Sequence, residues 1–236
     1  MPLFDPLLDP DFECRAAAKV KELQKKGQGP AQYRGECLQK ANACLQELRA
    51  SYRECQDVCR KALEEWIAAV RGICEDVLRF SQGVFRGLKD PAALAALCSA
   101  QIEMTEQTTR LRSALSHFLQ WEREAEQGEA LLTCLAEDLV LLCSCANEGE
   151  RATWESAILE IDKVTQAQQT QRNSFSLQRA AVLTFGTVEL SRFQNEFSAK
   201  CDFLNEGAAL SRTGVQFLLG EIERAVRELV SKLQNT

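Results

Sequence analysis

The chain has 236 residues, enough for one large domain or two small ones, and its 45% hydrophobic content is ordinary for a protein with a core. Its net charge of −6 argues against a general affinity for nucleic acid, because phosphate binding needs a basic field. Only 5 prolines and 12 glycines interrupt it, which favours a few long helices over a sheet with many turns.

No stretch approaches about 18 consecutive apolar residues, and the N-terminus lacks the basic start and unbroken apolar run of a signal peptide. We therefore expect a cytoplasmic protein, either free or peripherally bound to a membrane.

Residues 1–12 form a proline-paced segment of apolar and acidic residues, MPLFDPLLDPDF. Its LLDPD run resembles a clathrin-box peptide, with Leu7, Leu8, Asp9 and Asp11 at matching places and Pro10 departing at the fourth place. FDPLLDP also resembles the Asp-Pro tags that bind endocytic adaptors. Proline lowers the entropy that such a peptide loses on docking, and its apolar residues fill pockets. The alternative is a lead-in that packs on the bundle and caps the first helix.

A short amphipathic basic helix is predicted over 13–30. Asp9-Pro10-Asp11 suits a helix start, because an acid accepts hydrogen bonds from free amides and proline fits the first turn. The GQGP sequence at 27–30 ends the helix.

The segment 31–236 is predicted to be a bundle of long helices. From Ala31 to about Leu88 no proline intervenes, and apolar residues recur every seventh position from Leu38 to Phe80. This pattern predicts one helix of about 55 residues, or about 80 Å. A second long helix is predicted from Pro91, with a bend at Gly128, and the CANEGE sequence at 145–150 predicts a break.

The last predicted helix covers about 151–233. Val182, Phe193, Leu204, Val215 and Val226 recur every eleven residues, a spacing that keeps an apolar stripe straight on one helix. Gly186, Gly207 and Gly214 mark places where we expect this helix to soften or split. The predicted fold class is thus all-α: an elongated, antiparallel, coiled-coil-like bundle of long helices.

Catalytic and metal-binding motifs are absent from the sequence: it has no GxGxxG, GxxxxGK[ST], GxSxG, HExxH or EF-hand pattern. We therefore predict no enzyme, catalytic residue, cofactor or metal. The single histidine, His117, is interpreted as a helix-surface or interface residue. The eleven cysteines are interpreted as small hydrophobes. The alternative is zinc binding by the pairs Cys55/Cys59 and Cys143/Cys145, although no CxxC occurs.

Large apolar residues at helical spacing are candidates for contact with a partner chain, because stripes this long cannot all be covered within one slender monomer. The candidates are Trp66, Ile73, Phe118, Leu139, Phe193 and Phe197. For the tryptophans, an aromatic ligand cage is the alternative to a core or interface anchor.

Basic residues along two helices are candidates for contact with anionic lipid. These are Lys19, Lys21, Lys25, Lys26, Arg49, Arg53 and Arg60. Ordinary solvation beside neighbouring glutamates explains them equally well.

Two stretches carry a resemblance to a known family. FSQGVFRGLKDPAALAALCSAQIEMTEQTTRL (80–111) resembles the junction between the first two helices of a BAR module of sorting-nexin type. ALLTCLAEDLVLLCSCANEGERATWES (130–156) resembles the end and tip of its middle helix. The resemblance implies a banana-shaped homodimer that binds curved anionic membrane.

The leading hypothesis is a non-enzymatic, dimerising helical scaffold, BAR-like and active in membrane trafficking. The alternative is a coiled-coil subunit or adaptor of a larger cytosolic or cytoskeletal assembly, without lipid contact. The expected partners are a second copy or a helical protein, an anionic membrane, and clathrin or an adaptor at the N-terminal segment.

Overall fold

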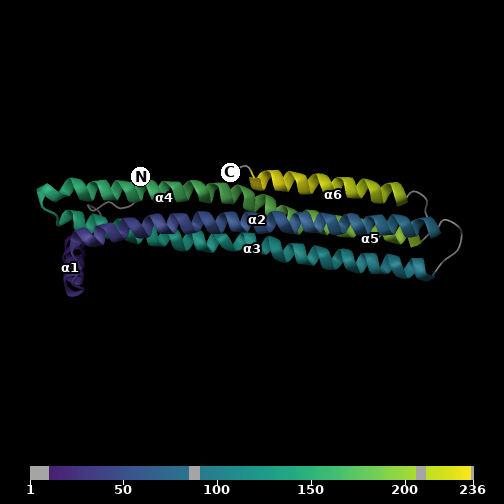
Figure 1. The fold of residues 1–236 in the computed structure, drawn as a ribbon, viewed down its shortest axis with the longest axis horizontal. Helices are drawn as coiled ribbons and strands as arrows, with labels where there is room; N and C mark the ends of the chain where they lie inside the picture. The colour runs from purple at the N-terminus through teal and green to yellow at the C-terminus, as the bar shows by residue number, and fades with distance from the viewer. Residues whose placement is uncertain (1–10, 85–90, 206–210, 235–236) are drawn as a thin grey trace. The chain divides into compact units, whose positions relative to one another are not determined.

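The computed structural model describes residues 11–84, 91–205 and 211–234. These residues are helical almost throughout: α1 (Phe12–Lys25), α2 (Pro30–Val84), α3 (Pro91–Ser144), α4 (Glu148–Thr184), the π-helix η2 (Phe185–Glu189), α5 (Leu190–Asn205) and α6 (Ser211–Gln234) (Figure 1). The prediction of an all-α bundle of long helices is confirmed. No described helix has an apolar stretch long enough to cross a membrane.

Glycine and proline set the helix boundaries near the predicted places. The α1 helix ends at Lys25, and Gly27 follows its cap with a φ of 65°, which suits a residue without a Cβ. There the Gln28 N–H donates to the Leu23 carbonyl (3.0 Å) and the Gly27 N–H to the Gln24 carbonyl (3.1 Å), which is a Schellman motif. Pro30 and Pro91 open α2 and α3, since proline in the first turn lacks only an amide that would be unpaired.

The predicted start of α1 is only partly described. Asp9 and Pro10 lie outside the described residues, and Phe12 is the first helical residue. Asp11 occupies the capping position, but its side chain makes no capping hydrogen bond; its carbonyl accepts from the Arg15 N–H (2.9 Å). The α4 helix, by contrast, is capped by Asn147, whose side-chain oxygen accepts from the Glu150 N–H (3.1 Å).

The chain divides into two compact units, and α2, α3 and α4 contribute to both. Unit 1 comprises residues 1–52 and 121–173, and unit 2 comprises 53–120 and 174–236. Each is described by itself below.

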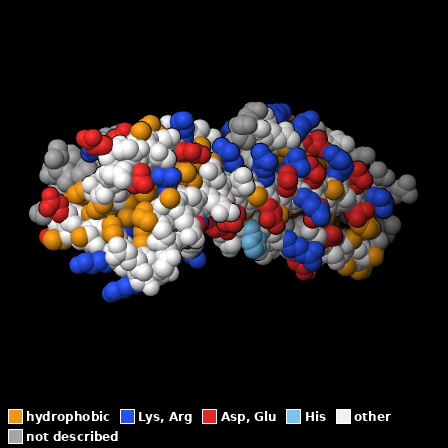
Figure 2. Space-filling model, turned by 60° about the vertical axis from the view of Figure 1, so that its left-hand side comes forward, with side chains coloured by type: hydrophobic (Ala, Val, Ile, Leu, Met, Phe, Trp, Pro, Cys, Tyr) orange, Lys and Arg blue, Asp and Glu red, His pale blue; other side chains and the backbone are white. Residues whose placement is uncertain are grey.

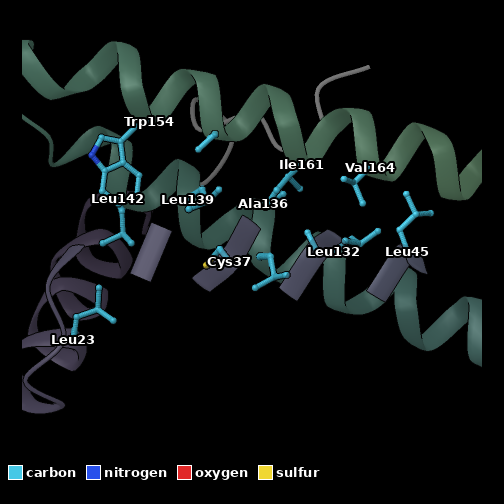
Figure 3. Packing of buried hydrophobic residues seen from close by; sticks show 13 residues of the cluster. Leu23, Cys37, Leu45, Leu132, Ala136, Leu139, Leu142, Trp154, Ile161 and Val164 are labelled. Atoms are coloured by element: carbon cyan, nitrogen blue, oxygen red, sulfur yellow. The ribbon is translucent and has the colours of Figure 1, made fainter. Parts of the chain in front are cut away.

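In unit 1, four helices enclose an apolar core. Figure 3 shows side chains of α1, α2, α3 and α4 pointing toward one another, among them Leu23, Leu45, Leu139 and Ile161. The α2 and α3 segments are antiparallel, because Tyr33 hydrogen-bonds to Asp138 while Ser51 hydrogen-bonds to Glu124. Burial of this apolar surface is the main force that holds the unit together.

Gly128 lets the helices of unit 1 approach closely. A Cβ at this position would lie 2.6 Å from Leu48 Cδ1 and 3.3 Å from both Cys44 Sγ and Gln168 Nε2. The α3 helix continues through Gly128. The separately predicted break at 145–150 is confirmed, because α3 ends at Ser144 and α4 begins at Glu148.

In unit 2, the C-terminal helix α6 folds back along the helices before it. Gln178 donates to the Lys232 carbonyl (3.1 Å), Arg192 donates to Glu221 (3.5 Å), and a Cβ at Gly214 would lie 3.0 Å from Lys200 Cδ, so α6 is antiparallel to α4 and α5. The α6 helix thus packs as a fourth helical layer with α2, α3 and α4–α5 in unit 2.

The predicted helical segment 151–233, which was expected to soften or split at its glycines, consists of α4, η2, α5 and α6, and the reversal of α6 is the part that was not predicted. Val182 and Phe193 lie before the reversal, Val215 and Val226 after it, and all four are buried. The eleven-residue repeat identified residues that face the core, but spacing alone does not reveal that the chain changes direction. Gly207 lies outside the described residues, and α6 continues through Gly214.

Candidate binding groove in unit 2

The π-helix η2 interrupts the last long helical stretch at Gly186, one of the three predicted soft points. The Leu190 N–H donates to the Phe185 carbonyl, five residues earlier, instead of four. Arg112 of α3 then donates from Nε to the Gly186 carbonyl (3.2 Å) and from Nη2 to Ser191 Oγ (2.8 Å). The guanidinium therefore satisfies a carbonyl at the place where the regular ladder is broken.

We predict that Arg112→Ala lowers the free energy of unfolding by about 1.5–3 kcal/mol, because it removes charged hydrogen bonds from a partly buried carbonyl. Arg110→Ala, at an exposed position of the same helix, is the matched control and should cost less than about 0.5 kcal/mol. Urea unfolding followed by circular dichroism measures both. Equal losses in the two variants would show that Arg112 does not support η2.

Two glutamines fix the end of α6 against the rest of unit 2. The buried Gln178 donates to the carbonyls of Lys232 (3.1 Å) and Leu233 (3.4 Å), and its oxygen accepts from Gln56 (3.0 Å). Gln56 also donates to the Leu233 carbonyl (3.0 Å). The last carbonyls of a helix have no partner within it, so these amides stabilise the docked position of α6.

A groove of about 820 Å³ runs between α4–η2 and α6 in unit 2. We call it the α4–α6 groove. Its apolar and small lining residues are Leu177, Ala180, Ala181, Phe185, Ala225 and Leu229. Leu177 is 78% exposed, so its side chain is accessible to a molecule that binds in the groove.

The groove carries acidic and basic side chains in equal number. These are Glu189, Glu221, Glu228, Arg192, Arg224 and Lys232. Arg192 pairs with Glu189 (2.9 Å) and Glu196 (3.2 Å), and the hydrogen bond that it donates to Glu189 raises the pKa of its guanidinium. Arg224, Glu228 and Lys232 are exposed. An electrically balanced, partly apolar groove suits a protein surface better than a highly charged small ligand.

The lipid candidates on α1 occupy two different environments. Lys19 lies 2.7 Å from Asp138, with its side chain only 17% exposed and its ammonium 5.0 Å from the centre of the Tyr33 ring. Lys21, Lys25 and Lys26 are exposed, and Lys26 pairs with Glu22 (2.6 Å). Lys19 therefore serves the packing of unit 1, while the other three lysines can reach a partner.

The remaining lipid candidates are divided between the units. Arg49 is exposed in unit 1, Arg53 is exposed in unit 2, and Arg60 of unit 2 pairs with Asp57 (3.0 Å). Figure 2 shows Lys and Arg side chains interspersed with Asp and Glu side chains on the face drawn. Leu7, Leu8 and Asp9 of the predicted adaptor peptide lie outside the described residues; Asp11 directly precedes α1.

The predicted interface residues are wrongly assigned. Trp66, Ile73, Phe118, Leu139, Phe193 and Phe197 are all at most 3% exposed within a single chain. The reason is that the monomer covers its own apolar stripes; in unit 2, for example, Phe118 stacks on Phe175 at 5.2 Å between ring centres. These six side chains offer no surface to a second chain.

The three tryptophans are core residues rather than an aromatic ligand cage. Trp66 packs edge-on against Phe185 in unit 2 (6.1 Å), and Trp121 packs against Tyr52 in unit 1 (4.8 Å). Trp154 is 2% exposed, and the guanidinium of Arg34 lies 5.1 Å from its ring centre. His117 is exposed on α3, as the interpretation of a surface residue predicts.

Five cysteines are buried as small hydrophobes: Cys37, Cys44, Cys59, Cys74 and Cys201. Burial raises the pKa of Cys37 to about 11 and the pKa of Cys59, Cys74 and Cys201 to about 12. Among the described residues, no group of three or more His, Cys, Asp or Glu side chains is arranged to hold a metal ion.

The groove residues were not identified from the sequence. The sequence signal for the groove is that Leu177 and Phe217 are large apolar residues outside the buried positions of their helices. This signal indicates a groove only when α6 is known to lie beside α4. Comparisons of the chain with protein-family models, with curated proteins and with solved structures found no match.

Proposed function

We propose that the protein is a non-enzymatic helical scaffold that works as a homodimer and associates through the α4–α6 groove. The observation that carries the proposal is the exposed Leu177 beside the small side chains Ala180, Ala181 and Ala225, since a leucine of one copy fits a hollow lined by alanines of another.

Charge favours a second copy as the occupant. A two-fold contact places one patch against an identical patch, so a uniformly acidic or basic surface would repel itself. The groove has three acids and three bases, whereas the whole chain carries a net charge of −6. The groove is thus a surface on which two net-acidic chains can approach without repulsion.

Leu177→Asp is predicted to reduce self-association by at least about tenfold, because it places a charge in a contact that excludes water. Light scattering coupled to gel filtration should give the wild type about twice the chain mass of 26.4 kDa and the variant close to the chain mass. Leu159→Asp is the control: Leu159 is 61% exposed on the same helix, but it belongs to unit 1. A wild type that stays monomeric would refute the proposal.

A second candidate function is binding to an anionic membrane, which the exposure of Lys21, Lys25 and Lys26 on α1 favours. This is the BAR-like part of the hypothesis. Reversal of these three charges should abolish co-sedimentation with vesicles containing phosphatidylserine, whereas Lys61→Glu, at a 77% exposed site in unit 2, should not. Binding that survives the triple reversal would remove this site. A purified chain that neither dimerises nor binds vesicles would favour the alternative of a subunit in a larger assembly.

A further inference from the structure

One face of α6 carries a row of exposed or partly exposed side chains: Phe217, Glu221, Arg224, Glu228 and Lys232. Their spacings of four, three, four and four residues place them on one face of the helix. The last four line the α4–α6 groove, and Phe217, which is 66% exposed, continues the row by one turn. A partner docked in the groove therefore meets this row along its whole length.

The charges of this row are complementary to themselves when the row is reversed. In the direction of the chain the order is acid, base, acid, base, from Glu221 to Lys232. An antiparallel copy, related by a two-fold axis midway between Arg224 and Glu228, sets each Arg224 opposite a Glu228 and each Glu221 within one residue of the position opposite a Lys232. All four charge pairs across that axis are then attractive, whereas a parallel copy in register sets like charges opposite each other.

The ends of the row match in the same register. Gln178 holds the carbonyls of Lys232 and Leu233, so its neighbour Leu177 lies at the C-terminal end of the row. Phe217 lies at the N-terminal end. The two-fold axis that pairs the charges therefore also brings Leu177 of one copy to the end where Phe217 of the other is exposed. These two side chains, 78% and 66% exposed, are the large apolar residues that such a contact would cover.

We infer that two copies of this chain associate through an antiparallel α6–α6 contact centred between Arg224 and Glu228, with Leu177 and Phe217 of opposite copies at each end. The inference rests on the proposed homodimer and specifies its register and orientation. The central pair defines the register, because Glu221 is already shared with Arg192 within the chain (3.5 Å).

A charge swap tests the register. Arg224→Glu places two carboxylates opposite each other on both sides of the axis, and Glu228→Arg places two guanidinium groups there. Each single variant should raise the dimer dissociation constant by more than about tenfold. The double variant Arg224→Glu/Glu228→Arg restores both attractive pairs and should return to within about threefold of the wild type. Arg227→Glu changes the net charge equally on another face of α6 and should have no effect.

Sedimentation equilibrium of the five proteins gives distinguishable results. Loss of the dimer in both single variants, with recovery in the double variant, would establish the register. A dimer that all four variants leave intact would refute the α6 contact but would still support the proposal that the protein is a homodimer. A wild type that is monomeric at every concentration would overturn both. Circular dichroism confirms that the variants stay folded, which exposed charge reversals should allow.

Discussion

Raising the pH from about 8 to about 10 under reducing conditions is expected to lower the free energy of unfolding by several kcal/mol. Four thiols, those of Cys37, Cys59, Cys74 and Cys201, are at most 1% exposed. Burial raises the pKa of the first to about 11 and of the other three to about 12, because a thiolate is poorly solvated in an apolar core.

The direction of the effect follows from proton binding. The unfolded chain releases its thiol protons near pH 8.5, while the folded chain keeps them until its raised pKa values are reached. The stability is therefore fully present below about pH 8.5 and is lost as the pH rises toward the folded values. Each thiol contributes a slope of about −1.4 kcal/mol per pH unit in that window.

Urea unfolding at several pH values, with a phosphine reductant, measures this slope. Cys59→Ala should reduce it by up to about one quarter, because it removes one of the four thiols whose pKa is raised to about 11 or 12. Cys134→Ala, at an exposed position, should leave it unchanged. A stability that stays flat up to about pH 10 would show that these thiols are not buried as the structure places them.

Trp121→Ala is expected to destabilise the protein by about 3–5 kcal/mol, the largest effect of any single substitution considered. The Trp121 side chain is fully buried in unit 1, packs against Tyr52 and donates from Nε1 to the Leu48 carbonyl (3.1 Å). The substitution leaves a cavity and removes the donor from that carbonyl.

Trp121→Phe separates the two contributions. It keeps much of the ring volume and removes the hydrogen bond, so it should cost about 1–2 kcal/mol. Leu131→Ala, at a 41% exposed site on the same helix, should cost less than about 1 kcal/mol. Urea midpoints of the three variants give these values. Equal losses for Trp121→Ala and Leu131→Ala would contradict the burial of Trp121.

Much of the fold could be predicted from residues that act locally. Gly27, Pro30 and Pro91 restrict the backbone directly, so the end of α1 and the starts of α2 and α3 lie close to the predicted positions. The seven-residue spacing of Cys59, Trp66 and Ile73 predicted a continuous apolar stripe, and all three side chains are buried, although Trp66 and Ile73 were expected to contact a partner chain. What the spacing could not reveal is which helix covers them.

The parts that could not be predicted depend on contacts between residues far apart in the chain. The reversal of α6 is held by Gln56 and Gln178, whose partners lie more than fifty residues away in sequence. In the sequence, Lys19 looks like any exposed basic residue of α1. Its contacts with Asp138 and Tyr33 come from distant parts of the chain and are evident only in the structure. The α4–α6 groove exists only because α6 returns along α4. The sequence alone could therefore not predict that its charged residues line one groove.

The most direct test of the central claim is a zero-length cross-link formed in an equal mixture of unlabelled and nitrogen-15-labelled protein. A carbodiimide joins a lysine to a carboxylate only when the two touch. Within one chain Glu221 and Lys232 are about 16 Å apart along α6. The antiparallel contact predicts a peptide pair that joins Glu221 of a labelled chain to Lys232 of an unlabelled one. If cross-linked dimers form without that mixed pair, or if no dimers form, the contact proposed for this groove does not exist.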